Sequence, residues 1–362
     1  MRGTDFDAGV AYGQQAADEI RVSIERYTAV FADAGVGSWI DARTLALRYR
    51  DTIATYAPGS LAQIGGIAEG SGLEVGDILA LNTRSELMFG VPHADFVEDG
   101  CTSVAVAPER SASGHSLLSQ NWDWTEAASE SVVLLVREGD DRPGYVTLVE
   151  AGLLAKTGMN SVGLGLCTNT LVSTTDTGDP DGLPYHVFLH ELLQMERVSD
   201  GLQFLHSTPR ALSANYLIMH ADGAVLDIET SGGGPEGVAH LTVSDGVLTH
   251  TNHFRDTRLS LTDRRVRENS NTVIRLDRIN RRLAMIGGKI DREDVLDCLR
   301  DHANYPLSVC LHGDPRKPAV RRTGTLATVF YDLGTSELWV AVGNPCESEF
   351  TGFSFTELLA GA

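Results

Sequence analysis

Lysine is scarce in this chain of 362 residues, which contains only Lys156, Lys289 and Lys317. Positive charge is in deficit as well, because 29 Lys and Arg residues stand against 49 Asp and Glu residues and give a net charge of −20 at pH 7. Such a charge repels the phosphates of nucleic acids and anionic lipids, so we expect no nucleic-acid partner. The sequence also has no apolar run long enough to span a membrane, and we expect no membrane partner.

Cysteine is rare and dispersed, with five residues and no CxxC spacing: Cys101, Cys167, Cys298, Cys310 and Cys346. An odd number of scattered cysteines suits a reducing compartment better than a disulfide framework. The same spacing argues against a structural zinc site, so we expect neither a metal nor another cofactor. The first residues lack the apolar core of a secretory signal, which predicts a cytoplasmic protein.

Two histidines provide the strongest metal signal in the sequence. His186 and His190 are four residues apart and would share one face of a helix. They do not form an HExxH motif, because leucine follows Glu191 at the next two positions. The segment 185–196 also has the pattern of an ordinary amphipathic helix, so a zinc hydrolase remains an alternative that metal analysis would decide.

Helical periodicity dominates the first part of the chain, and alternating or continuous apolar runs dominate the rest. Helices are expected at 8–31, 42–56, 61–70, 75–89, 185–196, 199–206 and 271–286. Strands are expected at 102–108, 116–123, 132–136, 145–150, 163–168, 214–220, 224–229, 239–243, 325–332 and 337–342. Many strands with helices before and between them predict an α+β layered fold.

Cys101 is the most informative single residue, because it follows Gly100 and opens a predicted strand. A thiol at this place can attack the preceding carbonyl, since glycine adds no side-chain bulk and tolerates a twisted backbone. Cleavage would leave Cys101 as a new N-terminus that carries both a nucleophile and a base: the thiol has a pKa of about 8.5 and an α-amino group one of about 7.7–8.0. On its own, however, Cys101 fits an inert, buried cysteine better, because that is the usual state of a free cysteine, and only its surroundings favour the nucleophile.

Seven segments together resemble the isopenicillin-N acyltransferase family of N-terminal-nucleophile hydrolases. The two most specific are DGCTS at 99–103 and QNWD at 120–123. The others follow the order of the family, at 9–15, 79–87, 158–164, 210–216 and 250–254. The resemblance implies a four-layer αββα sandwich in a single domain over residues 1–362. It also implies a zymogen that cleaves itself between Gly100 and Cys101 into fragments 1–100 and 101–362, which stay associated.

The resemblance also gives roles to Asp123 and Asn252. Asp123 ends the strand predicted after the Cys101 strand, where antiparallel pairing would bring its carboxylate to the new amino group. The alternative is an aspartate that caps a turn. Asn252 matches the family's oxyanion donor, whose amide stabilises the charge that develops on the substrate carbonyl. The alternatives are a turn asparagine, or a catalytic imidazole from His250 or His253.

Substrate-binding residues are harder to assign from the end of the chain. The segment around Arg322 and Thr325 resembles a pocket-lining segment of the family, but Arg321 stands where the family has serine. Leu311 likewise replaces arginine in the family's Cys-Arg-His stretch. On this resemblance, Arg322 and Thr325 are expected to line the substrate pocket. The departures at Arg321 and Leu311 affect the identity of the substrate more than the type of reaction.

The sequence thus predicts a self-processing cysteine amidohydrolase or acyltransferase that acts on a small-molecule amide or thioester through a Cys101 thioester. Hydrolysis and transfer differ only in the acceptor that reaches this thioester. A penicillin-type acyltransferase with acyl-coenzyme A as donor is one alternative. An unprocessed, non-catalytic binding or scaffold protein is another. A papain-like protease is disfavoured, because Thr102 and Ser103 follow Cys101 in place of the papain motif.

Overall fold

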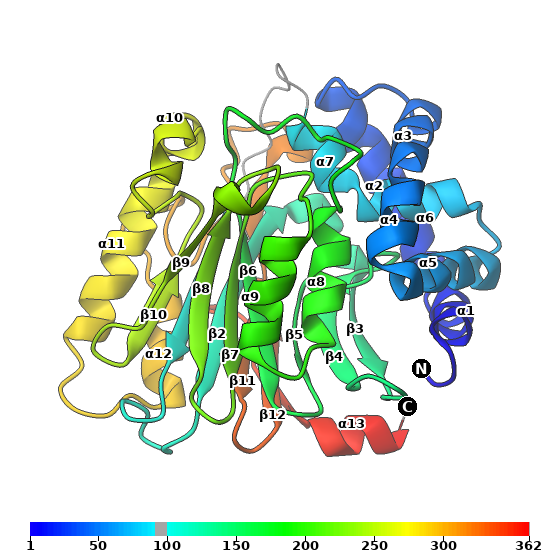
Figure 1. Ribbon diagram of the computed structural model, residues 1–362. Helices are drawn as coiled ribbons and strands as arrows, with labels where there is room; N and C mark the ends of the chain where they lie inside the picture. The colour runs from blue at the N-terminus through cyan, green and yellow to red at the C-terminus, as the bar shows by residue number, and fades with distance from the viewer. Residues whose placement is uncertain (91–99, 362) are drawn as a thin grey trace.

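The computed structural model describes residues 1–90 and 100–361 and consists of helices packed on two antiparallel sheets (Figure 1). In order of pairing, the first sheet contains β10 (Val247–His250), β1 (Gly100–Val106), β2 (Leu117–Thr125), β11 (Thr323–Asp332), β12 (Glu337–Val342) and β13 (Thr351–Ser354). In the same way, the second sheet contains β3 (Val132–Arg137), β4 (Tyr145–Glu150), β5 (Thr157–Asn160), β6 (Leu164–Thr170), β7 (Ala214–His220), β8 (Val225–Thr230) and β9 (Val238–Leu241).

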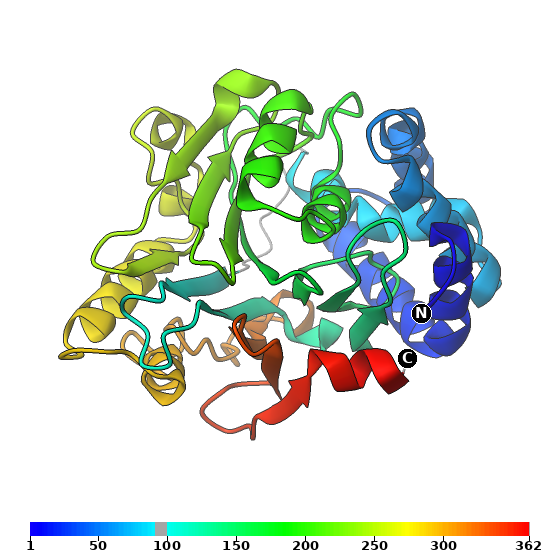
Figure 2. The ribbon, with the colours of Figure 1, turned by 60° about the horizontal axis from the view of Figure 1, so that its bottom comes forward.

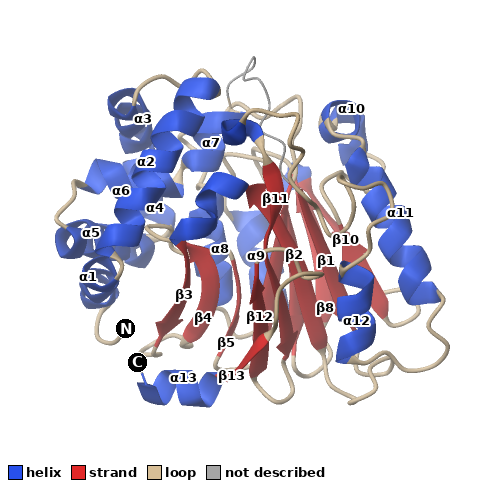
Figure 3. Ribbon diagram, turned by 180° about the vertical axis from the view of Figure 1, so that it is seen from behind, coloured by secondary structure: helices blue, strands red, loops and turns tan. Residues whose placement is uncertain are grey.

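The two sheets lie face to face, and helices cover both outer faces. Strands β1 and β2 pack against β6 of the second sheet. Helices α8 (Tyr185–Leu193) and α9 (Val198–Ser207) lie on the second sheet, and α11 (Asn271–Ala284) and α12 (Arg292–Leu299) lie on the first. Viewed from behind, α12 stands in front of the first sheet and α8 and α9 stand beyond it (Figure 3). The predicted four-layer αββα sandwich is therefore confirmed.

Strand β1 shows why the layers form. Its residues alternate between the two faces of the sheet. Cys101 and Ala105 join the large core between the sheets, whereas Val104 and Val106 pack against Ile279 and its neighbours on α11 and α12. Every residue of β1 and β2 is buried, as expected for strands covered on both faces. Cys101 is thereby fixed on a rigid central strand.

The first part of the chain forms a block of helices beside the sandwich: α1 (Asp5–Gln15), α2 (Ala17–Asp33), α3 (Trp39–Ala46), α4 (Arg50–Tyr56), α5 (Pro58–Ser71), α6 (Val75–Asn82) and α7 (Arg84–Phe89). The block is blue in Figure 2, which also shows the two termini close together. Helices α1 and α5 approach so closely that a Cβ on Gly9 would lie 2.2 Å from the Gln63 carbonyl oxygen. Glycine at this contact permits the close packing.

Several element boundaries differ from the predictions. The helix expected at 8–31 is two helices that meet at Ala16, and the helix expected at 75–89 is divided at Thr83. The short strands β5, β10 and β13 and the helices α10 (Arg265–Glu268), α12 and α13 (Phe355–Gly361) were missed. The remaining short elements are the 3-10 turns η1 (Leu47–Tyr49), η2 (Glu126–Ser131), η3 (Pro235–Gly237), η4 (Leu259–Thr262) and η5 (Ala319–Arg321). None of the helices within 1–90 and 100–361 has the length and apolar character needed to cross a membrane.

Candidate active site

Cys101 is the second residue of β1 and is 1% exposed. The side chains of Cys101, Ser103 and Ala105 lie on the face of β1 that is turned to the second sheet. There the Ser103 hydroxyl donates to Asn169 Oδ1 on β6 at 2.8 Å. Trp122 is the cross-strand partner of Cys101 on β2. The thiol therefore lies in the layer between the two sheets. Asp99 of the DGCTS segment lies outside the described residues.

Side chains from three elements bind the backbone of Cys101. Its N–H donates to Asn252 Oδ1 at 2.8 Å, and its carbonyl oxygen accepts from Asn169 Nδ2 at 3.0 Å and from the Arg275 guanidinium at 2.7 Å. Arg275 also donates to Asn252 Oδ1 at 2.8 Å. The peptide nitrogen that would become the amino group after cleavage is thus already held by Asn252.

Asp123 lies directly opposite Gly100 in the β1–β2 register. It is fully buried, and Thr325 on β11 donates its hydroxyl hydrogen to Asp123 Oδ1 at 2.6 Å. The other oxygen, Oδ2, faces Gly100 so closely that a Cβ built there would stand 2.9 Å away. The predicted proximity of Asp123 to the Gly100–Cys101 junction is found. The expectation that Asp123 ends its strand was wrong, because β2 continues to Thr125 and the turn-capping alternative fails with it.

Asn252 lies just after β10 and is 1% exposed. In the intact chain its Oδ1 accepts from Cys101, and its Nδ2 donates to the Thr170 carbonyl at 3.0 Å. A carboxamide nitrogen carries two hydrogens, so the bond to Thr170 uses one of them. The backbone N–H of Asn252 is fixed by Thr272 Oγ1 at 2.8 Å. The side chain is therefore oriented at both ends next to Cys101.

The two histidines beside Asn252 are engaged with other groups. His250 Nε2 contacts Glu229 Oε1 at 2.8 Å, and Nδ1 contacts the Thr251 carbonyl at 2.6 Å. Burial by itself lowers the pKa of His250, but attraction to Asp227 and bonding to Glu229 raise it above its usual value. Burial lowers the pKa of His253 to about 4. Neither imidazole makes a hydrogen bond to Cys101 among the described contacts, which disfavours a Cys-His pair.

Arg322 and Thr325 have different surroundings. Thr325 joins the site through Asp123, as described above. Arg322 lies ahead of β11, and its guanidinium donates to the carbonyl oxygens of Lys317 at 3.0 Å and Pro315 at 3.3 Å. The structure thus brings Cys101, Asp123, Asn252 and Thr325 together, and it connects Arg322 to the 315–317 loop.

Arg275 was missed by the sequence predictions, although a signal was present. It lies in an arginine-rich helix, yet it is spaced four and eight residues from Ile279 and Leu283, on the buried face of α11. A charged residue on an apolar helix face needs a buried polar partner, because an unpaired buried charge is costly. Asn169 gave no comparable signal, because an asparagine within a strand has no distinctive spacing.

Lys156 is a second missed residue, and it is one of only three lysines. It is 3% exposed, and its ammonium group lies 3.3 Å from the Tyr185 hydroxyl and 6.0 Å from the centroid of a Trp122 ring. Burial by itself lowers the pKa of Lys156, but attraction to the ionised forms of Tyr185 and Cys101 raises it above its usual value. The Lys156 cation is therefore electrostatically coupled to the Cys101 thiol, in the sense that favours a thiolate.

The two histidines of α8 have structural partners. Both ring nitrogens of His190 make contacts, Nδ1 with the Ser60 hydroxyl at 2.7 Å and Nε2 with the Tyr145 hydroxyl at 3.0 Å. His186 Nδ1 contacts the Ala155 carbonyl at 2.9 Å. Within the described residues they form no group with a third metal-ligating side chain, so the geometry disfavours the zinc hydrolase alternative.

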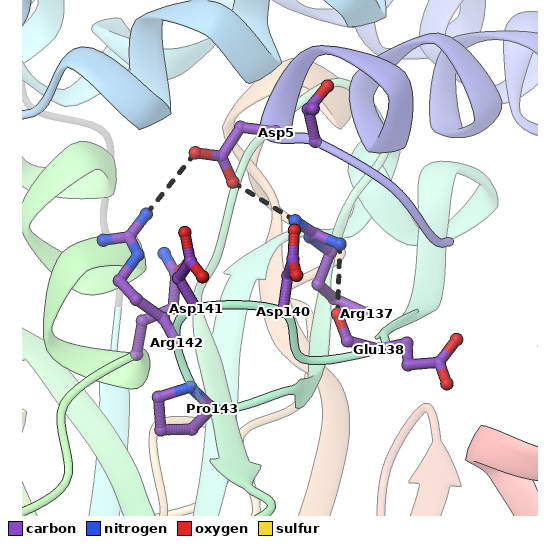
Figure 4. A pocket seen from close by; sticks show the side chains of 9 residues that line it. Asp5, Arg137, Glu138, Asp140, Asp141, Arg142 and Pro143 are labelled. Carbon is purple, nitrogen blue, oxygen red and sulfur yellow. Dashed lines mark hydrogen bonds and ion pairs between the residues drawn. The ribbon is translucent and has the colours of Figure 1, made fainter.

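A surface pocket lies where α1 meets the β3–β4 connection (Figure 4). Its lining is charged, and both of its arginines pair with Asp5: Arg137 lies 3.3 Å and Arg142 3.7 Å from this aspartate. Neither Cys101, Asp123 nor Asn252 lines it. We interpret this pocket as an ion-paired contact between the helical block and the sandwich.

The four-layer αββα sandwich is the fold type of the N-terminal-nucleophile hydrolases. Similar solved structures include a variant of conjugated bile acid hydrolase from Clostridium perfringens (TM-score 0.47, 13% identity, 70% of this chain and 97% of that chain covered). Another is penicillin V acylase from Agrobacterium tumefaciens (TM-score 0.43, 14% identity, 71% and 87% covered).

The chain belongs to the acyl-coenzyme A:6-aminopenicillanic acid acyl-transferase family, whose model matches residues 110–347. A curated relative is the 40 kDa form of acyl-coenzyme A:6-aminopenicillanic-acid-acyltransferase from Emericella nidulans. It is 26% identical over 345 residues, which cover 95% of this chain and 92% of the relative. The predicted family is thereby confirmed. The family match includes Asp123, Asn252, Arg322 and Thr325 and begins after Cys101.

Proposed function

We propose that this chain cleaves itself between Gly100 and Cys101 and that Cys101 then acts as the N-terminal nucleophile of an amide hydrolase or acyltransferase. The observation that carries the proposal is the set of bonds around one peptide unit. Asn252 binds the Cys101 nitrogen at 2.8 Å, and Asp123 faces Gly100 across the strand pair. These groups surround the atoms that self-cleavage would change.

Self-cleavage begins with attack of the Cys101 sulfur on the Gly100 carbonyl carbon. The C–S bond forms, the C–N bond to Cys101 breaks, and the nitrogen takes up the thiol proton, which leaves a thioester on Gly100. Water then hydrolyses the thioester to give a carboxylate on Gly100 and a free thiol and amino group on Cys101. Gly100 suits this step because a side chain there would collide with Asp123.

Turnover uses the same sulfur on an external carbonyl. The free amino group of Cys101 accepts the thiol proton and returns it to the leaving amine or thiol, so one residue supplies both nucleophile and base. Asp123 orients this amine through a charge-assisted hydrogen bond. Asn252 supplies an N–H to the developing oxyanion, a contribution of about 2.7–4 kcal/mol in comparable sites.

The acyl group then passes from the Cys101 thioester to an acceptor. With water the reaction is hydrolysis, and with an amine it is transfer. The family name pairs an acyl-coenzyme A donor with a small amine acceptor, which supports small molecules as substrates of this chain. Thr325, buried beside Asp123, is proposed to line the acyl pocket. Arg322 is proposed to lie at its outer rim, because it is only partly buried.

The two fragments are proposed to remain associated after cleavage. Residues on both sides of the junction share one hydrophobic core, which includes Ile20 and Leu81 from the helical block and Leu153 and Leu166 from the sandwich. Separating the fragments would expose this core to water, at a cost of about 25 cal/mol for each Å² of apolar surface.

The test compares Cys101→Ala with Cys298→Ala, which removes a cysteine from the separate core beneath α12, on the opposite face of the first sheet from the Cys101 core. Cys101→Ala is expected to stay a single folded chain and to have no activity on N-acyl or acyl-thioester substrates. Cys298→Ala is expected to be cleaved and active. Gel analysis and a substrate panel check both. Normal cleavage or turnover in folded Cys101→Ala would refute the nucleophile role, and an uncleaved, inactive wild type would favour the scaffold alternative.

A further inference from the structure

Four side chains that the proposed function does not use converge on one point between the loop that follows α12 and the loop that follows β12. His302, Cys310, His312 and Cys346 each direct one ligand atom there, and these atoms all lie within 4.8 Å of one another. The two Sγ atoms are 3.5 Å apart, and the two Nε2 atoms are 3.1 Å apart. His312 Nε2 lies 3.5 Å from Cys310 Sγ and 3.4 Å from Cys346 Sγ.

These separations are close to those of a tetrahedral zinc site. Zinc bonds of about 2.3 Å to sulfur and about 2.0–2.1 Å to nitrogen, at tetrahedral angles, place the ligand atoms about 3.8 Å (S–S), 3.6 Å (S–N) and 3.3 Å (N–N) apart. The observed distances follow the same order, S–S and S–N longer than N–N. Two thiolates and two imidazoles are also the donor set that tetrahedral zinc prefers.

The surroundings match a structural metal site as well. Asn344 directs its Nδ2 toward Cys310 Sγ at 3.6 Å and donates to the Leu311 carbonyl at 2.7 Å. Hydrogen bonds to the ligands of a metal orient them and are a regular part of such sites. The Tyr305 ring packs against both imidazoles, with centroids 6.2 Å from His302 and 5.2 Å from His312. Three of the ligands come from one loop, and Cys346 comes from the loop after β12.

We propose that His302, Cys310, His312 and Cys346 bind one zinc ion in a closed Cys2His2 site. Binding releases one proton from each thiol, and the zinc then joins the 302–312 loop to the loop after β12. With four protein ligands the ion has no open position for substrate, so its role is structural. The expectation of no structural zinc site rested on local CxxC spacing, whereas these ligands span residues 302–346 and meet only in the folded chain.

The loop that carries these ligands also supports the candidate active site. Leu311, between Cys310 and His312, accepts from the Thr325 N–H at 2.8 Å and donates to Thr325 Oγ1 at 3.0 Å. Thr325 in turn donates to Asp123. Zinc would thus hold Leu311 in the place from which it binds Thr325, and Thr325 positions Asp123. The ion itself would not touch the reacting atoms.

The experiment is metal analysis of the full chain, purified under reducing conditions without chelator. About one zinc ion per chain is expected. After removal of zinc with a chelator, added Co²⁺ should produce the visible bands of a tetrahedral site with sulfur ligands. Cys346→Ser and His302→Gln, both at surface positions, should fold and weaken zinc binding by more than about tenfold. Cys298→Ser is the matched control and should bind zinc like the wild type.

Three results would overturn the proposal. The first is wild-type protein without zinc that gives no tetrahedral cobalt spectrum. The second is wild-type metal affinity in both Cys346→Ser and His302→Gln. The third is a native Cys310–Cys346 disulfide, found by peptide mapping without reduction. None of these readouts depends on enzymatic activity, so they are independent of the role proposed for Cys101.

Discussion

Two groups of buried polar side chains in this molecule differ in what they bind. At the junction of the helical block and the sandwich, Arg84 and Glu150 form an ion pair at 2.7 Å, with side chains 2% and 0% exposed. Glu150 also accepts from the Tyr27 hydroxyl at 2.5 Å. Around Cys101, by contrast, Asn252 accepts from the N–H of that residue and Arg275 donates to its carbonyl oxygen. We call these the junction cluster (Tyr27, Arg84, Glu150) and the site cluster (Asn169, Asn252, Arg275).

The difference separates a structural role from a chemical one. In the junction cluster, Tyr27 and Arg84 from the helical block both bind the Glu150 carboxylate of the sandwich. These bonds hold the two parts of the fold together. Side chains of the site cluster converge on the N–H and carbonyl of Cys101, which they orient. We therefore expect substitutions in the first cluster to change stability and substitutions in the second to change rates.

The largest effect is expected for Arg84→Met in the uncleaved Cys101→Ala chain. Removing one partner of a buried ion pair leaves the buried Glu150 carboxylate without its cation, which costs about 3–5 kcal/mol. Arg84 also lies 4.4 Å from the centroid of a Trp124 ring, and the methionine loses this cation–π contact. Urea unfolding followed by tryptophan fluorescence measures the loss.

Arg26→Met is the matched control for this prediction. Arg26 pairs with Glu130 at 2.9 Å across the same junction, but the two side chains are 38% and 68% exposed. Exposed pairs contribute at most about 1 kcal/mol, so the control should be nearly as stable as its parent. Equal losses in Arg26→Met and Arg84→Met would contradict the importance given to the buried pair.

Asn252→Ala tests the site cluster, in which we expect a substitution to change the rate more than the stability. If Asn252 donates to the oxyanion chiefly in the transition state, kcat of the cleaved enzyme should fall by about 10²–10³ with little change in KM. The midpoint of urea unfolding should change far less than in Arg84→Met. Steady-state kinetics on the cleaved fraction test this, and a wild-type kcat would remove Asn252 from the catalytic residues.

Asp123→Asn is expected to have a smaller effect, which appears in the pH dependence. A carboxylate near the Cys101 amine stabilises its ammonium form, so its removal lowers the pKa of the amine. The amine then stays unprotonated to lower pH, and the acidic limb of kcat/KM should move down by about one pH unit. A limb that stays in place would show that Asp123 does not act on the amine.

Features with a local sequence signal were predicted well. Gly100 next to Cys101, and Asp123 on the following strand, could be placed together because a hairpin pairs neighbouring strands. Strands such as 145–150, 214–220 and 337–342 were found at the observed boundaries because these segments are rich in β-branched, aromatic and other apolar residues. The layered fold followed from the alternation of these elements.

Features built from distant segments were not predicted. Arg275 reaches Cys101 from a helix 174 residues away, and its arginine-rich neighbours concealed it. Cys346 meets Cys310 across 36 residues, outside any spacing rule for metal ligands. In both cases tertiary packing creates the contact, so the composition of the local segment carries little information about it.

The most direct test of self-cleavage before Cys101 is the intact mass of the purified wild-type protein, with N-terminal sequencing of its fragments. We predict two chains, residues 1–100 and 101–362, which elute together in native buffer, and the larger chain should begin Cys-Thr-Ser-Val. A single chain of 362 residues that turns over an N-acyl substrate at full rate would contradict the claim that Cys101 acts as an N-terminal nucleophile.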